Sequence, residues 1–363
     1  MKILIAPDKF KGTLSAQEVC EALAKGLSQH GEHEIKMLPL ADGGEGTKEL
    51  FIKHLQAKPV SVLVHDPLMR PIHAEYALSA DGKTAFIELA SASGLSLLKP
   101  VERNPLLTTT FGTGELIRDA LNRGVVNIFV GIGGSATNDA GLGLLSALGA
   151  RMLNEKKEEF IPRGETLIDL DQIDFSTLHP QISKTTFTAL CDVQNPFYGE
   201  NGAACIYAPQ KGANEMQVNQ LDVGLGHVAK IIQQQTGVDL QKISGSGAGG
   251  GVAGGLHALL NTNLKRGIDV VFEITHFNEA IQWADVVITG EGKVDEQTWQ
   301  GKVVAGVINE ARLMGTVAIV VCGQQESNVQ QTFEIYSLAS EFGITRALKD
   351  TKAALSEIVQ KIR

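Results

Sequence analysis

The chain has 363 residues, which is enough for two domains with full hydrophobic cores. Hydrophobic residues make up 43% and charged residues 20% of the sequence, so a mainly disordered protein is excluded. The formal net charge of −9 argues against a nucleic-acid scaffold, and any anion site must be local, built from a few basic side chains and backbone N–H groups.

The cysteines and the N-terminus indicate the compartment. The four cysteines, Cys20, Cys191, Cys205 and Cys322, contain no C-x-x-C pair. This spacing fits neither a zinc site nor a disulfide framework and indicates a reducing compartment. Residues 1–8 do not resemble a signal peptide, and no run approaches the roughly 18 apolar residues of a membrane span. We therefore expect a cytoplasmic protein without a membrane or nucleic-acid partner.

The N-terminal segment predicts two successive strand–loop–helix units. Residues 2–6 form a short apolar run typical of a buried strand, and Ser15 with Glu18 makes a capping box for a helix over 15–29. A second strand is predicted over 34–39 and a second helix from Thr47. This alternation predicts an α/β layer with a parallel sheet.

The middle of the chain is less regular. Strands predicted over 59–64, 72–79 and 84–90 are joined by turns, so antiparallel pairing is expected. They are followed by a helix over 114–123, a strand over 125–130, a helix over 139–150, a strand over 185–191 and a helix near 214–235.

The C-terminal end returns to the first pattern, with a strand over 285–289, a helix over 299–313, a strand over 317–322 and a helix from about 351 to 362. These elements complete the first sheet. The prediction is an α/β protein with one domain made of 1–70 plus 285–363 and a second, inserted domain of 71–284.

Glycine is over-represented, and its clusters follow the predicted strands. There are 39 glycines, about 11% against a usual ~7%. In α/β sheets, ligands bind outside the carboxyl ends of strands. Asp8 follows the first strand beside Lys9 and Lys11, and Asp42 and Glu45 lie among glycines after the second. These carboxylates suit a metal ion or a proton, with solvated or tight turns as the ordinary alternative.

Two further loops offer backbone donors. The 131–141 loop combines flexible backbone with polar side chains before a helix and predicts phosphate binding, its candidates being Gly133, Gly134, Ser135, Thr137 and Asn138. The glycine-rich run 245–255 contains Gly247, Gly249 and Gly250. Because no convincing strand precedes it, a dinucleotide site is disfavoured. Two interpretations of this run remain open: a flexible loop that covers phosphates, and a contact between helices through small residues.

Two acidic segments complete the candidates. The loop after strand 285–289 contains Gly290, Glu291, Lys293 and Asp295, which suit a metal, phosphate or base site or simply a charged surface. Asp192 follows strand 185–191 and suits a base or a substrate anchor, or else a turn before Pro196.

The inventory of donor-rich loops, carboxylates and lysines suits phosphoryl transfer, in which the protein mostly positions groups and neutralises charge. No G-x-x-x-x-G-K-[ST], H-E-x-x-H or G-x-S-x-G motif occurs. A nicotinamide-dependent dehydrogenase is disfavoured because the first strand is not followed by G-x-G-x-x-G. A non-catalytic sugar-acid-binding module stays open, although it would not need acidic residues in three glycine-rich loops.

Six motifs in order resemble the bacterial glycerate kinases of the type I family: 7–16, 39–47, 131–141, 208–213, 245–255 and 288–298. The resemblance covers nearly the whole chain. It implies an ATP-dependent, Mg²⁺-requiring kinase of D-glycerate that forms 2-phosphoglycerate. It also implies a flavodoxin-like, Rossmann-like parallel-sheet domain with an inserted mixed-sheet α/β domain, and a site in the cleft between them. Lys9 stands where the family often has Ser, and Ala140 where it often has Gly.

On this basis each candidate receives a hypothetical role. Asp192 is the first candidate for the base that accepts the hydroxyl proton, and Asp8 the second. Lys11 and Lys293 would offset phosphoryl charge, and the glycine run would close over the site. Mg²⁺ would bind among Asp42, Glu45, Glu291 and Asp295. Phosphorylation of the 3-hydroxyl or of a related hydroxy acid stays open, as does the oligomeric state, with a homo-oligomer among the alternatives.

Overall fold

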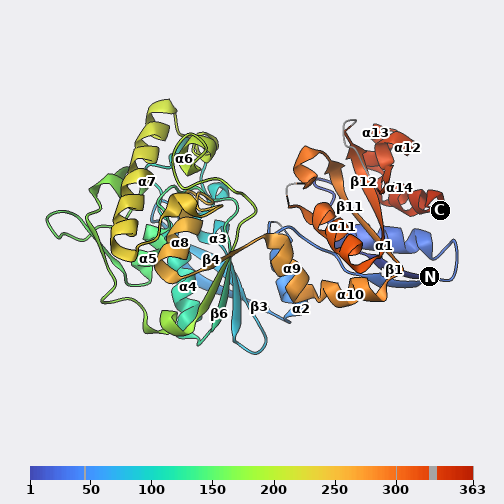
Figure 1. Cartoon of the computed structure of the whole chain (residues 1–363), viewed down its shortest axis with the longest axis horizontal. Helices are drawn as coiled ribbons and strands as arrows, with labels where there is room; N and C mark the ends of the chain where they lie inside the picture. The colour runs from blue at the N-terminus through green and yellow to red at the C-terminus, as the bar shows by residue number, and fades with distance from the viewer. Residues whose placement is uncertain (45, 300, 327–332, 363) are drawn as a thin grey trace. The chain divides into compact units, whose positions relative to one another are not determined.

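A computed structural model describes residues 1–44, 46–299, 301–326 and 333–362. The chain divides into two compact units. Unit 1 comprises Met1–His54 and Arg266–Arg363, and unit 2 comprises Leu55–Lys265. In Figure 1 the blue and red ends of the chain together form unit 1, whereas unit 2 is one continuous segment. Unit 2 is therefore an insertion within the sequence of unit 1.

Unit 1 contains a five-stranded parallel sheet in the order β13-β12-β11-β1-β2. Its strands are β1 (Lys2–Ile5), β2 (Glu34–Met37), β11 (Val286–Val294), β12 (Val317–Gln325) and β13 (Glu334–Ser337). Counted within the unit, this is the order 2-1-3-4-5 of flavodoxin-like folds. The predicted flavodoxin-like parallel sheet is confirmed. Strand order reverses between β1 and β11, so a ligand crevice is expected at their carboxyl ends.

Helices cover both faces of this sheet. The helices of unit 1 are α1 (Ala16–Leu27), α2 (Thr47–His54), α9 (Gly267–Thr275), α10 (Phe277–Trp283), α11 (Val303–Met314), α12 (Leu338–Phe342), α13 (Ile344–Lys349) and α14 (Thr351–Ile358). Ile3 and Ile5 of β1 pack with α1, α12 and α14, whereas Leu4 packs with α9, α10 and α11. This alternation follows from the pleat of a strand buried on both faces. The capping box that starts α1 is present.

Unit 2 contains a six-stranded mixed sheet in the order β10-β9-β6-β5-β4-β3. Its strands are β3 (Lys58–His65), β4 (Pro71–Leu78), β5 (Thr84–Glu88), β6 (Asn127–Gly131), β9 (Thr186–Leu190) and β10 (Asn263–Lys265). The strands from β10 to β5 are parallel, and β4 pairs antiparallel with both β5 and β3. A hairpin of β7 (Arg151–Leu153) and β8 (Gln172–Asp174) is separate. The predicted mixed sheet is confirmed.

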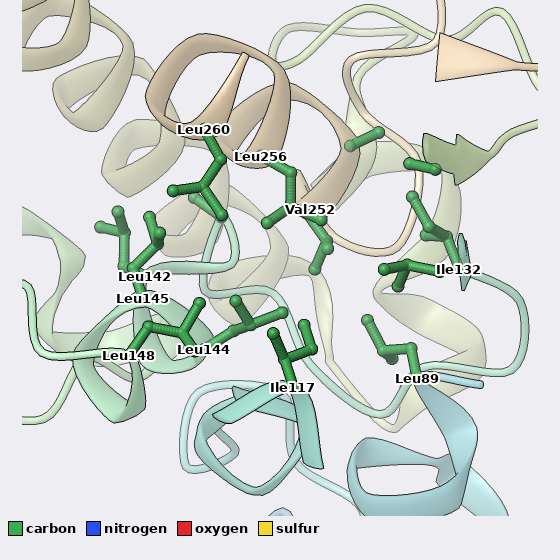
Figure 2. Packing of buried hydrophobic residues seen from close by; sticks show 14 of the residues in the cluster. Leu89, Ile117, Ile132, Leu142, Leu144, Leu145, Leu148, Val252, Leu256 and Leu260 are labelled. Atoms are coloured by element: carbon green, nitrogen blue, oxygen red, sulfur yellow. The ribbon is translucent and has the colours of Figure 1, made fainter. Parts of the chain in front are cut away.

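The helices of unit 2 are α3 (Ala90–Ser93), α4 (Phe111–Asn122), α5 (Leu142–Ala147), α6 (Ala203–Tyr207), α7 (Glu215–Thr236) and α8 (Val252–Leu260). Figure 2 shows Val252, Leu256 and Leu260 of α8 gathered near Leu142 and Leu145 of α5, all within one buried cluster. This core anchors the segments on either side of the 131–141 loop and the end of the glycine-rich run. Among the described residues, no helix is both long and apolar enough to cross a membrane.

The structure differs from the sequence prediction in several places. Gly290, Glu291 and Lys293 were predicted in a loop after strand 285–289, but they lie within β11, which extends to Val294. Residues 55–70 belong to unit 2, where β3 pairs along its length with β4. Residues 266–284 belong to unit 1 because α9 and α10 pack on its sheet. The helix predicted over 139–150 begins only at Leu142, since Ala140 and Gly141 have φ angles of 59° and 73° that no α-helix accepts.

Candidate functional site

The reversal of strand order in unit 1 brings Asp8 beside β11. The N–H of Asp8 donates to the carbonyl of Gly290 at 2.8 Å, and Thr289 Oγ1 donates to the carbonyl of Ala6 at 2.8 Å. These bonds continue the β1–β11 pairing past the end of β1. Residues 8–13 therefore leave the sheet at its carboxyl edge, next to Glu291.

Asp8 has an unusual environment for a carboxyl group. It is only 7% exposed, and its Oδ1 accepts a hydrogen bond from the N–H of Lys9 at 2.7 Å. Burial and the negative charges of Asp42 and Glu291 raise the pKa of Asp8 to about 7, against the opposing effect of Lys9. A carboxyl with this pKa exchanges protons readily near neutral pH.

A cavity of about 490 Å³, named here the switch-point cavity, opens at this edge. It brings together carboxylates and lysines from three stretches of the chain, 8–11, the segment with Asp42, and 291–302. The charged residues in its wall are Asp8, Lys9, Lys11, Asp42, Glu291, Lys293, Asp295 and Lys302. Six of these were predicted site residues, so one cavity collects most of the candidates from unit 1. Glu45 lies outside the described residues.

The carboxylates of the switch-point cavity differ in their partners. Glu291 is 7% exposed; its Oε2 lies 3.8 Å from Lys302 Nζ, and its buried Oε1 has no hydrogen-bond partner among the described residues. Burial raises the pKa of Glu291. Lys293 Nζ lies 3.6 Å from Asp295 Oδ2 and 2.6 Å from Glu326 Oε1. An orphaned buried carboxylate oxygen is a potential ligand for a hard cation.

The packing of the sheet explains why position 290 is a glycine. A Cβ atom at this position would lie 1.9 Å from the carbonyl oxygen of Val321 in β12. The glycine therefore permits close packing inside the sheet. Nothing in this packing points to the predicted contact with a nucleotide.

The 131–141 loop of unit 2 follows β6 at the carboxyl edge of the mixed sheet. Gly133 and Gly134 are exposed, whereas residues 135–141 are buried. Ser135 forms an isolated bridge with Gly94, and the carbonyl of Gly134 accepts a bond from the N–H of Leu95. Residues 94 and 95 thus hold the exposed backbone at Gly134 in place.

Lys211 is a site residue that the sequence reasoning did not single out. Lys211 is 3% exposed, and its ammonium donates to Ser135 Oγ and to the carbonyl of Thr137, both at 2.7 Å. Burial lowers the pKa of Lys211 to about 7, although the nearby Asp139 acts in the opposite direction. The 208–213 motif was the available signal, but no strand end or glycine cluster marked its lysine.

The buried half of the 131–141 loop is polar. The Oδ2 atom of Asp139 accepts bonds from the N–H and the Oγ1 of Thr110 at 2.7 and 2.8 Å. Burial raises the pKa of Asp139, and these bonds oppose the shift. Thr137 Oγ1 and both polar side-chain atoms of Asn138 are buried without a partner among the described residues. Their hydrogen-bonding capacity is left for groups that the chain does not supply.

The glycine-rich run packs tightly against this loop. A Cβ atom at Gly250 would lie 2.1 Å from the carbonyl oxygen of Thr137, and one at Gly247 would lie 2.2 Å from that of Pro196. A Cβ atom at Gly249 would lie 2.3 Å from Ile132 Cγ2. The glycines therefore serve close backbone packing. This arrangement matches the predicted alternative of small-residue contact better than it matches a covering loop.

Gly250→Ala should destabilise the protein by about 3 kcal/mol, because a φ of +76° is unfavourable for alanine and the new Cβ overlaps the Thr137 carbonyl. Gly237→Ala is the matched control: its φ is +78° and a Cβ there meets nothing within 4 Å, so the loss should be about 1 kcal/mol. Urea unfolding of both variants measures the difference. Equal losses would show that close packing at Gly250 is unimportant.

Asp192 occupies the same edge of the mixed sheet as the 131–141 loop. It follows β9, and Leu190 of β9 pairs with Gly131 at the end of β6. Asp192 is exposed, and the thiol of the preceding Cys191 donates to the carbonyl of Val193 at 3.3 Å. The Asp192 carboxylate is therefore not buried, in contrast to the carboxylate of Asp8.

Comparisons with known proteins identify the family to which the chain belongs. The model of the glycerate kinase family matches residues 3–363. A glycerate kinase of Bacillus cereus is 43% identical over 95% of this chain and 89% of its own length. The glycerate 2-kinase of Escherichia coli is 43% identical over 91% of this chain and 87% of its own length.

A solved structure shows the same fold along the whole chain. The crystal structure of a Salmonella typhimurium LT2 protein provisionally named glycerate kinase 2 has a TM-score of 0.87 and 39% sequence identity, with coverage of 100% of this chain and 98% of that protein. The family match, the identities and the fold agree. The chain is an enzyme, a kinase, and belongs to the glycerate kinase family.

Proposed function

We propose that the enzyme transfers the γ-phosphoryl group of ATP to D-glycerate, forming 2-phospho-D-glycerate and ADP. Family membership supports the substrate class. The observation that carries the chemistry is the switch-point cavity, where a buried carboxyl with a pKa of about 7 lies beside further carboxylates and lysines. A cytoplasmic location is part of this proposal.

Asp8 is the base in this proposal. The 2-hydroxyl oxygen forms a bond to the γ-phosphorus while the bond from that phosphorus to the β–γ bridging oxygen breaks and ADP leaves. The hydroxyl proton passes to the Asp8 carboxylate. A base works best when its pKa lies near the operating pH, and the pKa of Asp8 fits this requirement. Asp192, the first candidate from sequence, has no comparable burial to support the role.

The cations of the switch-point cavity offset charge on the transferring group. Lys11 and Lys293 line the cavity and would pair with phosphate oxygens. In unit 2, the exposed backbone at Gly133 and Gly134 would donate to a phosphate or to the carboxylate of glycerate. Ser135, through its bond to Lys211, would keep that backbone in place, and the polar atoms of Thr137 and Asn138 that have no partner among the described residues would be free to bind a ligand.

The switch-point cavity also fits Mg²⁺. Asp42, Glu291 and Asp295 line it, and Glu291 has an unpartnered buried oxygen. Among the described residues no three acidic, His or Cys side chains form a ready-made metal site. Mg²⁺ is usually held by one or two carboxylates, and phosphate oxygens and water would complete its shell. When bound, Mg²⁺ would neutralise phosphate charge.

A coupled ADP-release assay tests this function. D-glycerate with Mg²⁺ should give sustained ADP release, and omission of either should reduce the rate to the background of ATP hydrolysis. Turnover with another hydroxy acid but none with D-glycerate would retain phosphoryl transfer and reject the substrate. Acid binding without any turnover, indifferent to Mg²⁺, would favour a non-catalytic binding module.

A further inference from the structure

A second cavity is also lined by the 8–13 segment. It has a volume of about 540 Å³ and is lined by α1, α2 and residues 8–14, so it is named here the α1–α2 cavity. Both cavities share Asp8, Lys9, Phe10, Lys11 and Thr13 in their walls. A single extended ligand could therefore reach from one cavity to the other across this segment.

The α1–α2 cavity has an apolar lining. Its apolar residues are Phe10, Leu14, Ala16, Pro39, Leu40 and Leu50. Phe10 and Leu40 are almost completely buried, so this part of the wall is fixed by the packing of unit 1. Ligand sites of this size are typically apolar with a few polar groups that set orientation.

The wall of this cavity also carries polar groups. Lys9, Lys11 and Lys53 outnumber the two carboxylates, Asp8 and Glu49. Ala16 and Gln17 form the first turn of α1, where backbone N–H groups have no partner within the helix. The site thus offers an apolar slot, backbone donors and a cationic edge toward the switch-point cavity.

We infer that the α1–α2 cavity binds the purine nucleoside of the nucleotide co-substrate, with the phosphates passing over the 8–13 segment into the switch-point cavity. A purine has flat apolar faces and acceptor nitrogens at its edge, which match the slot and the α1 donors. Glycerate is small and polar throughout and has no apolar surface to fill this slot. The inference rests on the proposed function, since it presumes a nucleotide substrate.

Two substitutions that fill the cavity from opposite walls test the inference. Ala16→Trp extends from α1 and Glu49→Trp from α2, and both native side chains are at least partly exposed, so the larger residues should be tolerated. Each variant should raise KM for ATP and the Kd for ADP about tenfold or more, and change KM for D-glycerate by no more than about twofold. Lys25→Trp is the control, on an exposed position of α1 outside this cavity, and should match wild type.

The outcomes separate this inference from the proposed function. Active wild-type enzyme with unchanged ATP and ADP constants in both variants would overturn the cavity assignment and leave the kinase intact. A selective rise in KM for D-glycerate would also overturn it and assign the cavity to the acid. Absence of ADP release by the wild type would instead reject the proposed function. Because ADP binding is measured by calorimetry without glycerate, the nucleotide site is tested even then.

Discussion

Asp8→Asn is expected to reduce kcat by about 100-fold or more while leaving KM for ATP and D-glycerate close to wild type. Asparagine keeps the shape of the side chain but cannot accept the hydroxyl proton. Steady-state kinetics at a series of pH values measure the effect. The residual activity should also lose any dependence on the ionisation of residue 8.

The fold of the Asp8→Asn variant should be intact, and its stability profile provides an independent check. Because the folded-state pKa of Asp8 is about 7 and its ordinary value is 3.8, the folded state binds more protons between these values. Asp8 therefore contributes stability at low pH that is lost as pH rises toward 7. Asp8→Asn removes this loss, so the variant should be at least as stable as wild type at neutral pH.

Asp192→Asn tests the alternative assignment of the base to Asp192. If Asp192 is the base, this variant should lose turnover at least as severely as Asp8→Asn is expected to. Full activity in Asp8→Asn together with an inactive, folded Asp192→Asn would move the base from unit 1 to unit 2. The two isosteric substitutions therefore decide between the sequence-based first candidate and the residue that the structure favours.

Lys211→Met is expected to lower kcat/KM by roughly 100-fold, because it removes the donor to Ser135 Oγ and the Thr137 carbonyl and lets the 131–141 loop shift. It should also change how stability depends on pH. The pKa of Lys211 is about 7 in the folded protein against an ordinary 10.5, so the unfolded chain binds more protons between these values.

Wild-type stability should accordingly gain a contribution from Lys211 of about 1.4 kcal/mol per pH unit as pH rises above 7, and Lys211→Met should lack it. Urea unfolding of wild type and Lys211→Met at several pH values between about 7 and 9 measures the difference in their free energies of unfolding. The contributions of the other titrating groups cancel in this difference. Lys230→Met is the control, an exposed lysine on α7. A wild-type slope in Lys211→Met would show that the Lys211 ammonium is not desolvated.

The parallel sheet of unit 1 was predictable because its strands are short apolar runs followed at once by polar loops. β1, β11 and β12 were located from this pattern, as was the capping box of α1. β13 was missed, since Glu334–Ser337 is a short edge strand without a continuous apolar run. The start of unit 2 was predicted too late in the chain. Only the pairing of β3 with β4 shows that β3 belongs to this unit, and that pairing cannot be read from the sequence.

The candidate site was predictable where a residue follows a strand. The rule that parallel strands present their carboxyl ends at one edge placed Asp8 and Asp42 together, and they line one cavity with Glu291, which lies inside a strand longer than predicted. Lys211 could not be found in this way because it reaches the 131–141 loop from a short 3₁₀ turn far along the chain. The close packing of Val321 against Gly290 could not be read from the sequence, and the predicted phosphate contact of Gly290 stays a prediction.

Phosphorus NMR of the reaction product tests the central claim most directly. After incubation of the enzyme with ATP, Mg²⁺ and D-glycerate, we expect a new ester resonance split into a doublet by the single proton on C2. A triplet from two protons on C3 would contradict 2-phosphorylation. The absence of any new phosphate ester, with ADP at the background level, would contradict D-glycerate phosphorylation altogether.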